Sequence, residues 1–199
     1  MAAELAGYGY AVLLPDIYYR QPGWAPFDMA TVFGDDAERQ RLFAMMAAVT
    51  PQRMTDDAQV FFDYLASRSE VRGTKFGVCG YCMGGRTSII VAGRLPDRVG
   101  AAASFHGGGL VTNAADSPHL SADRIMATVY VAGAVDDASF TEADAETLDA
   151  ALTGAEVSHQ VEFYPAAHGF AVADSPSYDP DAAARHWAAM RSLFADALG

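Results

Sequence analysis

The feature that most constrains the fold of this chain is a glycine-rich turn around a cysteine. Residues 80–85 read Gly-Tyr-Cys-Met-Gly-Gly and directly follow the apolar run 75–79. A nucleophile on a turn from strand to helix adopts a strained conformation, and the neighbouring glycines remove the Cβ atoms that would clash there. The pattern therefore predicts a buried strand, then Cys82 on a nucleophile elbow, then a helix that begins near Met83.

The expected helix would point its amino-terminal end at the sulfur of Cys82. That end of a helix carries partial positive charge and free N–H groups, which favour a thiolate and an oxyanion. The turn thus predicts a nucleophilic cysteine. The structural alternative is a glycine-rich turn that holds a buried cysteine without chemistry.

A thiol nucleophile needs a base, and the base needs an acid that orients it. His168 comes just after the alternating run 157–165, which predicts a strand, and Gly169 follows it. Asp136 and Asp137 come just after the run 127–133, which also predicts a strand. The chain order of nucleophile, acid and histidine is the order found in α/β-hydrolases.

These motifs, taken together, resemble the dienelactone hydrolase family, which is the cysteine branch of the α/β-hydrolases. The matching stretches are distributed over most of the chain: residues 14–20, 80–85, 133–137 and 168–170. The resemblance implies an α/β-hydrolase fold. It also implies a reaction in which an unsaturated lactone or a related ester is opened by acyl transfer to a cysteine, without a cofactor or metal.

The family's catalytic triad carries over to Cys82, Asp137 and His168. Asp137 is preferred to Asp136 because the family places a hydrophobic residue three positions after the acid, and Phe140 stands at that distance from Asp137. Asp136 remains an alternative.

The resemblance also implies residues that hold the substrate. Arg20 matches the family's arginine for a substrate carboxylate, whereas Val172 stands where the family has a second arginine. The backbone N–H of Met83 is expected in the oxyanion hole. Tyr81 and His106 are expected to bind substrate, since His106 follows a predicted strand at the end where open α/β sheets bind ligands.

Strands and helices alternate along the chain, which predicts one α/β domain over residues 1–199 with a mostly parallel sheet and helices on both faces. Val60 and Tyr64 recur at helical spacing and are expected in the core. The expected strands are 10–14, 75–79, 101–105, 127–133 and 157–165, and the expected helices are 35–49, 55–68, 83–91, 141–152 and 181–198.

The resemblance begins inside the helix that precedes the strand ending at Pro15 and Asp16. Family members carry further strands before this point, and one of them lies between the Val12 strand and the Val78 strand. Its loop supplies a second oxyanion-hole N–H, and a family glutamate that interacts with the cysteine also lies there. We therefore expect the first strands to be missing, through a miscalled start or a fragment, which would impair catalysis.

Composition excludes several classes of partner. The net charge of −12 argues against nucleic acid and against anionic membrane surfaces. No apolar run approaches the ~20 residues of a membrane span, and the first residues lack the features of a signal peptide, so a cytoplasmic location is expected. Cys79 and Cys82 form a C-x-x-C pair without nearby further ligands, so Cys79 is expected to be a core residue and no metal is expected.

Two other interpretations stay open. Glutamine amidotransferases also place a cysteine on such an elbow, but they usually pair it with a His-x-Glu motif, which His168-Gly169-Phe170 does not match. The chain could instead be a catalytically impaired fragment or a binding or assembly protein. The sequence makes no prediction of the oligomeric state.

Overall fold

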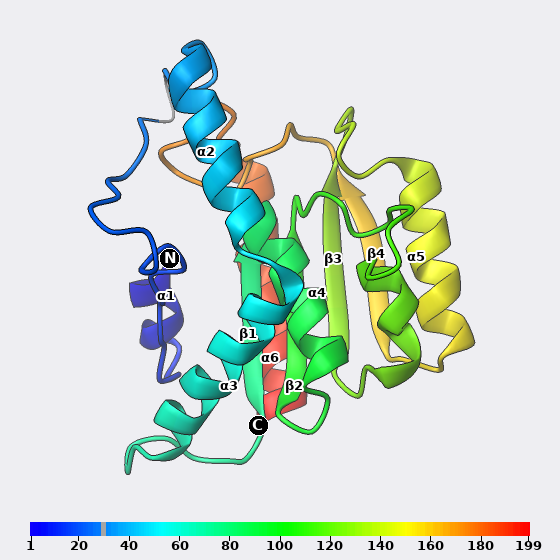
Figure 1. The fold of residues 1–199 in the computed structure, drawn as a ribbon. Helices are drawn as coiled ribbons and strands as arrows, with labels where there is room; N and C mark the ends of the chain where they lie inside the picture. Colours follow the sequence, from blue (N-terminus) through cyan, green and yellow to red (C-terminus); the bar gives the residue numbers. More distant parts are fainter. Residues whose placement is uncertain (29–30) are drawn as a thin grey trace. The chain divides into compact units, whose positions relative to one another are not determined.

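The computed structural model describes residues 1–28 and 31–199 (Figure 1). It contains two compact units, residues 1–72 and residues 73–199, which are described separately below. The expectation that residues 1–199 form a single domain stays a prediction.

The first unit is helical. Its helices are α1 (Ala2–Gly7), α2 (Asp36–Ala48) and α3 (Pro51–Ala66). The side chain of Asp35 caps α2 by accepting a hydrogen bond from the N–H of Glu38. Thr50 caps α3 in the same way, and Pro51 occupies the first helical turn, where a missing N–H costs nothing. Helix α3 therefore begins earlier than the expected residue 55.

The expected strand at residues 10–14 is not present. Within residues 1–28 and 31–72 there is no strand at all, and Val12 and Leu14 are 37% and 80% exposed. A strand needs a neighbour to satisfy its backbone N–H and C=O groups, and this unit offers none. The expected core of α3 is also wrong in part, because Val60 and Tyr64 are exposed whereas Met54 and Phe62 are buried.

The second unit is built on a four-stranded parallel sheet of order β1-β2-β3-β4, which confirms the predicted fold class. Each strand lies within a few residues of its expected position. The strands are β1 (Phe76–Tyr81), β2 (Val99–Phe105), β3 (Thr128–Ala134) and β4 (His159–Tyr164). The helices are α4 (Met83–Arg94), the 3₁₀ helix η1 (Pro118–Arg124), α5 (Glu142–Gly154) and α6 (Pro180–Leu198).

Helices cover both faces of this sheet. Helix α4 packs against β1 and β2, with η1 between α4 and α5, and α6 packs against β1, β2 and β3. Figure 1 shows α4 in front of the sheet and α6 behind it. Every residue of β2 is buried, as expected for an inner strand covered on both sides.

All four strands run in the same direction, so their carboxyl ends meet at one edge. Tyr81 pairs with Phe105 in the register of the sheet, and Ala134 pairs with Tyr164. The residues that follow these strands therefore converge at one edge, which is where open α/β sheets place their ligand sites. Cys82, His106, Asp137 and His168 all belong to these loops.

Candidate active site

The structure places Cys82 on a strained turn between β1 and α4. Its φ and ψ are 53° and −119°, a backbone conformation that residues other than glycine rarely adopt. A Cβ atom on Gly80 would overlap the backbone of Gly84, and one on Gly85 would lie 2.6 Å from the Oγ of Ser104. Gly80 and Gly85 therefore allow the backbone segments around the cysteine to pack more closely than a larger residue would permit.

Cys82 is also the residue that caps α4. Its carbonyl oxygen accepts hydrogen bonds from the N–H groups of Gly85 at 3.0 Å and Arg86 at 3.2 Å. Met83 is the first residue of the helix, so its N–H has no acceptor within the helix. This N–H is available beside the cysteine, and its role in an oxyanion hole stays a prediction.

The acid beside His168 is Asp137. The Nδ1 of His168 donates a hydrogen bond to Oδ2 of Asp137 over 2.6 Å. The other carboxylate oxygen accepts from the N–H and the hydroxyl of Ser139, at 2.9 and 2.7 Å. Burial opposes ionisation of this carboxyl, but the bonds from Ser139 and His168 outweigh it and lower its pKa. The part played by Ser139 was not predicted from the sequence, although Asp-x-Ser is the pattern of a turn closed by an aspartate.

His168 lies between the acid and the cysteine. Hydrogen bonding to Cys82 raises the pKa of His168 to about 9, against the opposing effect of burial, and the bond to Asp137 adds to the rise. Because Nδ1 is occupied by Asp137, Nε2 is the ring nitrogen that faces the thiol. The imidazole is therefore held in its charged form, next to the sulfur of Cys82.

Asp136 lies outside this arrangement. It is exposed, its backbone has a φ of 59°, and it lines an open cleft of about 470 Å³. The cleft also contains Asp137, Pro165, His168 and Ser177. No hydrogen bond of the Asp136 side chain is found among residues 1–28 and 31–199.

His106 packs directly against the ring of His168. Their ring centroids are 4.9 Å apart, and Phe170 covers another side of His106 at 5.0 Å. Burial lowers the pKa of His106 to about 4, and repulsion from His168 adds to this. The ring of His106 is therefore neutral at pH 7 and packs against the ring of His168. Its expected part in substrate binding stays a prediction.

The hydroxyl of Tyr81 is directed into the protein. It lies 2.7 Å from Nε2 of His186, whose Nδ1 lies 2.9 Å from the carbonyl oxygen of Ala183. A carbonyl oxygen only accepts, so Nδ1 carries the proton and Tyr81 donates to Nε2. His186 lies in α6 and is fully buried. Tyr81 could contact substrate only through its ring, and that role stays a prediction.

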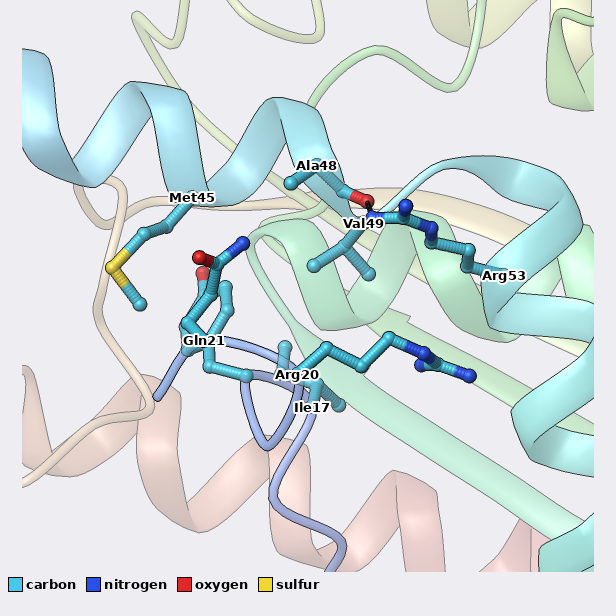
Figure 2. Close-up of a pocket in the computed structure, with 8 residues that line it drawn as sticks. Ile17, Arg20, Gln21, Met45, Ala48, Val49 and Arg53 are labelled. Atoms are coloured by element: carbon cyan, nitrogen blue, oxygen red, sulfur yellow. Dashed lines mark hydrogen bonds between the residues drawn. The ribbon is translucent and has the colours of Figure 1, made fainter. Parts of the chain in front are cut away.

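Arg20 lies in the first unit, where it is paired with Asp57. The two side chains form a bidentate ion pair with distances of 2.5 and 2.6 Å. Figure 2 shows Arg20 and Arg53 beside a small pocket of the same unit, and Arg53 donates to the carbonyl oxygen of Ala48 at 2.7 Å. Both cations of this pocket are therefore engaged, and the expected role of Arg20 in binding a substrate carboxylate stays a prediction.

Residues 1–28 and 31–199 contain no group of three or more His, Cys, Asp or Glu side chains arranged to hold a metal ion. Within the same ranges, no helix combines the length and the apolar character that crossing a membrane requires.

Comparison with known proteins gives consistent matches over nearly the whole chain. The model of the "Dienelactone hydrolase family" matches residues 1–198. A protein of Synechocystis sp. named "Putative carboxymethylenebutenolidase" is 31% identical over 196 residues, which cover 96% of this chain and 76% of that protein. The carboxymethylenebutenolidase of Pseudomonas putida is 28% identical over 181 residues, covering 90% and 71%.

Solved structures agree with this result. A Klebsiella pneumoniae structure described as a "Putative Dienelactone Hydrolase" superposes with a TM-score of 0.73 at 23% identity, covering 91% of this chain and 73% of that one. At this identity the likeness shows the fold alone. The dienelactone hydrolase-like promiscuous phosphotriesterase P91 from metagenomic libraries gives a TM-score of 0.69 at 27% identity, covering 98% and 77%.

Proposed function

Because this chain belongs to the dienelactone hydrolase family and is a hydrolase of that type, we propose that it opens unsaturated lactones or related esters through a cysteine nucleophile. The observation that carries the proposal is the position of His168, which is hydrogen-bonded to Cys82 on one side and to Asp137 on the other. This is the arrangement of a nucleophile, its base and an orienting acid.

The first half of the reaction transfers the acyl group to sulfur. The thiolate of Cys82 attacks the carbonyl carbon, and the carbonyl oxygen becomes an oxyanion near the N–H of Met83. When the tetrahedral intermediate collapses, the C–O bond to the ring or alcohol oxygen breaks, and this oxygen takes the proton from Nε2 of His168. The products are a thioester on Cys82 and a free hydroxyl group.

The second half hydrolyses the thioester. His168, now neutral, takes a proton from water, and the resulting hydroxide attacks the thioester carbon. The C–S bond breaks, and the products are a carboxylic acid and the original thiolate–imidazolium pair. These steps use only water as a second reactant, so the proposal requires neither a cofactor nor a metal.

Asp137 and Asp136 provide a matched pair for the test. Asp137→Asn should lower kcat on p-nitrophenyl acetate and on a lactone by about 10²- to 10⁴-fold, because an amide cannot stabilise the imidazolium and favours the wrong tautomer. Asp136→Asn removes the same charge one residue away and should change kcat less than about 3-fold. If the two variants rank in the opposite order, the acid is Asp136.

Cys82→Ala tests the nucleophile in the same assay. The variant should lose ester turnover, and wild-type protein quenched during turnover should show the mass of an acyl group on the peptide that contains Cys82. Full activity of Cys82→Ala would refute a cysteine mechanism. Lack of ester hydrolysis by the wild-type chain would favour the alternative of a catalytically impaired fragment or a binding protein.

The amidotransferase alternative is less well supported. Enzymes of that type would need a glutamate two residues after the histidine, and here the residue at that distance is Phe170, which is fully buried. The acid bonded to His168 comes instead from the loop after β3.

A further inference from the structure

The strand end that precedes Cys82 is bonded to a helix through a polar side-chain pair. Tyr81 is the last residue of β1, and its hydroxyl lies 2.7 Å from Nε2 of His186. His186 belongs to α6, which packs against β1 on the face of the sheet opposite α4 (Figure 1). The segment around the cysteine is therefore attached to α6 by a side chain and continues into α4 through its backbone.

A histidine is an unusual residue for the buried side of α6. Because His186 is fully buried, its ring nitrogens need hydrogen-bond partners to replace water. Nδ1 donates to the carbonyl oxygen of Ala183 at 2.9 Å, and Nε2 accepts from Tyr81. A leucine or phenylalanine at this position would have no such requirement. The other buried residues of α6 are all apolar: Ala182, Ala183, Met190, Leu193 and Phe194.

The hydrogen bond adds direction to a cluster of aromatic rings. Tyr81 stacks on Phe105 with ring centroids 5.7 Å apart, and the rings of Phe105 and His186 meet at 4.5 Å. The rings of Tyr81 and His186 are 5.5 Å apart, so the three contact one another pairwise. Apolar contacts are non-directional, whereas a hydrogen bond restricts both distance and angle. The bond to His186 therefore selects one orientation of the Tyr81 side chain.

This orientation matters because the residue after Tyr81 is strained. The φ of Cys82 is 53°, and such a conformation persists only where the surrounding structure imposes it. The N–H of Cys82 donates to the carbonyl oxygen of Phe105 at 3.1 Å, so Phe105 holds both neighbouring residues. The ring of Tyr81 also lies 5.9 Å from that of His106, which packs against His168. A shift of Tyr81 would thus affect both the nucleophile and the base.

We propose that His186 is a positioning residue for Cys82 and acts through the hydroxyl of Tyr81. This inference rests on the proposed function and adds a pair outside the triad that keeps the sulfur beside His168. Without the bond, the strained turn has more freedom to relax, and the sulfur spends less time in contact with the imidazolium. The thiolate is then less well stabilised and reacts more slowly.

The first test does not need turnover. Tyr81→Phe keeps the ring and removes the hydroxyl, so the rate constant for alkylation of Cys82 by iodoacetamide at pH 7 should fall about 3- to 10-fold. His186→Leu removes the acceptor and should give a similar fall. The double variant should fall no further than the single ones, because both act through the same bond. Mass spectrometry of the full chain after timed labelling measures all three.

His186→Gln and Tyr130→Phe are the controls. The amide oxygen of glutamine can replace Nε2 as an acceptor, so His186→Gln should be closer to wild type than His186→Leu. Tyr130 also contacts the ring of Phe105, but its buried hydroxyl is bonded to Glu162 and Tyr164. Tyr130→Phe should therefore leave alkylation within about 2-fold of wild type, even where it lowers Tm.

An equal fall in Tyr81→Phe and Tyr130→Phe would mean a general loosening of the second unit and would overturn the proposal. Unchanged alkylation in Tyr81→Phe and His186→Leu would overturn it as well. Circular dichroism shows that each variant is folded at the assay temperature. Tyr81→Phe is the decisive variant if His186→Leu does not fold, because it leaves the packing of the ring intact.

A second measurement separates this proposal from the proposed function. In Tyr81→Phe, kcat on p-nitrophenyl acetate should fall about 3- to 10-fold with KM within about 2-fold, because the nucleophile moves while the ring is kept. If alkylation and kcat both keep their wild-type values while the ester is hydrolysed, the positioning role is refuted and the hydrolase stands. If alkylation falls as expected but the wild-type chain hydrolyses no ester, the positioning role stands and the proposed function fails.

Discussion

The two cysteines stand three residues apart and differ in environment. Cys79 lies inside β1, and burial raises the pKa of its thiol to about 11. Cys82 caps α4 and is hydrogen-bonded to His168. Since only the thiolate is nucleophilic, the residues should differ widely in reactivity.

Iodoacetamide should therefore label Cys82 before Cys79 in the folded protein. At pH 8 a thiol with a pKa of about 11 is ionised to about one part in a thousand. The order of labelling is measured by mass spectrometry of digests taken over time, with protein in urea as the control in which both thiols react. Equal rates in the folded protein would contradict the assigned environments.

The raised pKa of His168 makes a prediction for pH dependence. Its value of about 9 lies above the ordinary 6.5, so the imidazolium persists at neutral pH and is lost as the pH rises through 9. Acyl transfer needs this proton for the leaving oxygen, so kcat/KM should fall above about pH 9.

Alkylation of Cys82 needs the thiolate but no general acid, so its rate should not fall over the same range. The two pH profiles, measured side by side, separate loss of the acid from unfolding, which would change both. A kcat/KM that keeps rising above pH 10 would mean that His168 does not act as the acid.

At the scale of elements, the turn between β1 and α4 depends on contacts between backbone atoms. A Cβ on Gly80 would overlap the carbonyl group of Gly84, whereas one on Gly154 at the end of α5 would meet nothing within 4 Å. The two glycines thus offer the same substitution in a closed and an open environment.

Gly80→Ala should lower Tm by about 4–10 °C and reduce ester turnover, because the overlap must be relieved by moving the elbow. Gly154→Ala should leave Tm unchanged or raise it slightly, since alanine is the better helix former. Thermal unfolding followed by circular dichroism measures both. If Gly80→Ala is as stable and active as Gly154→Ala, the elbow does not need its close packing.

Elements were predictable where their signals are local. The strands of the second unit appear as short apolar runs that end in glycine or polar residues, and their positions in the sheet agree with this pattern. The segment 10–14 has the same appearance, but it forms no strand because no neighbour pairs with it. In α3, Val60 and Tyr64 share one helical stripe and Met54 and Phe62 lie on another, and only packing selects which is buried.

At the scale of the whole molecule, the two units differ in how much they bury. The first unit has no strand within its described residues, and its buried apolar side chains are Leu5, Val32, Met45, Met54 and Phe62. The second unit has a parallel sheet with an almost continuously buried inner pair of strands, β2 and β3. Local stability follows such differences in buried contacts.

Hydrogen exchange followed by mass spectrometry should therefore show faster exchange in peptides of residues 1–72 than in peptides of β2 and β3. The difference should persist at several pH values once intrinsic rates are corrected, because it reflects local opening rather than chemistry. Equal protection of the two units would indicate that they open together as one cooperative structure.

The sequence by itself determined the family, the parallel α/β class and the positions of Cys82, the aspartate pair and His168. These features depend on short patterns, because glycines around a nucleophile and apolar runs act within a few residues. The tertiary structure decided what lies far apart in sequence. It placed Asp137 rather than Asp136 against His168, paired the hydroxyl of Tyr81 with the buried His186 and bound Arg20 to Asp57. Among the described residues it also left the Nε of Arg86 buried without a hydrogen-bond partner. Such pairings depend on loop geometry and on competition among many charged groups, and no local pattern encodes which partner is reached.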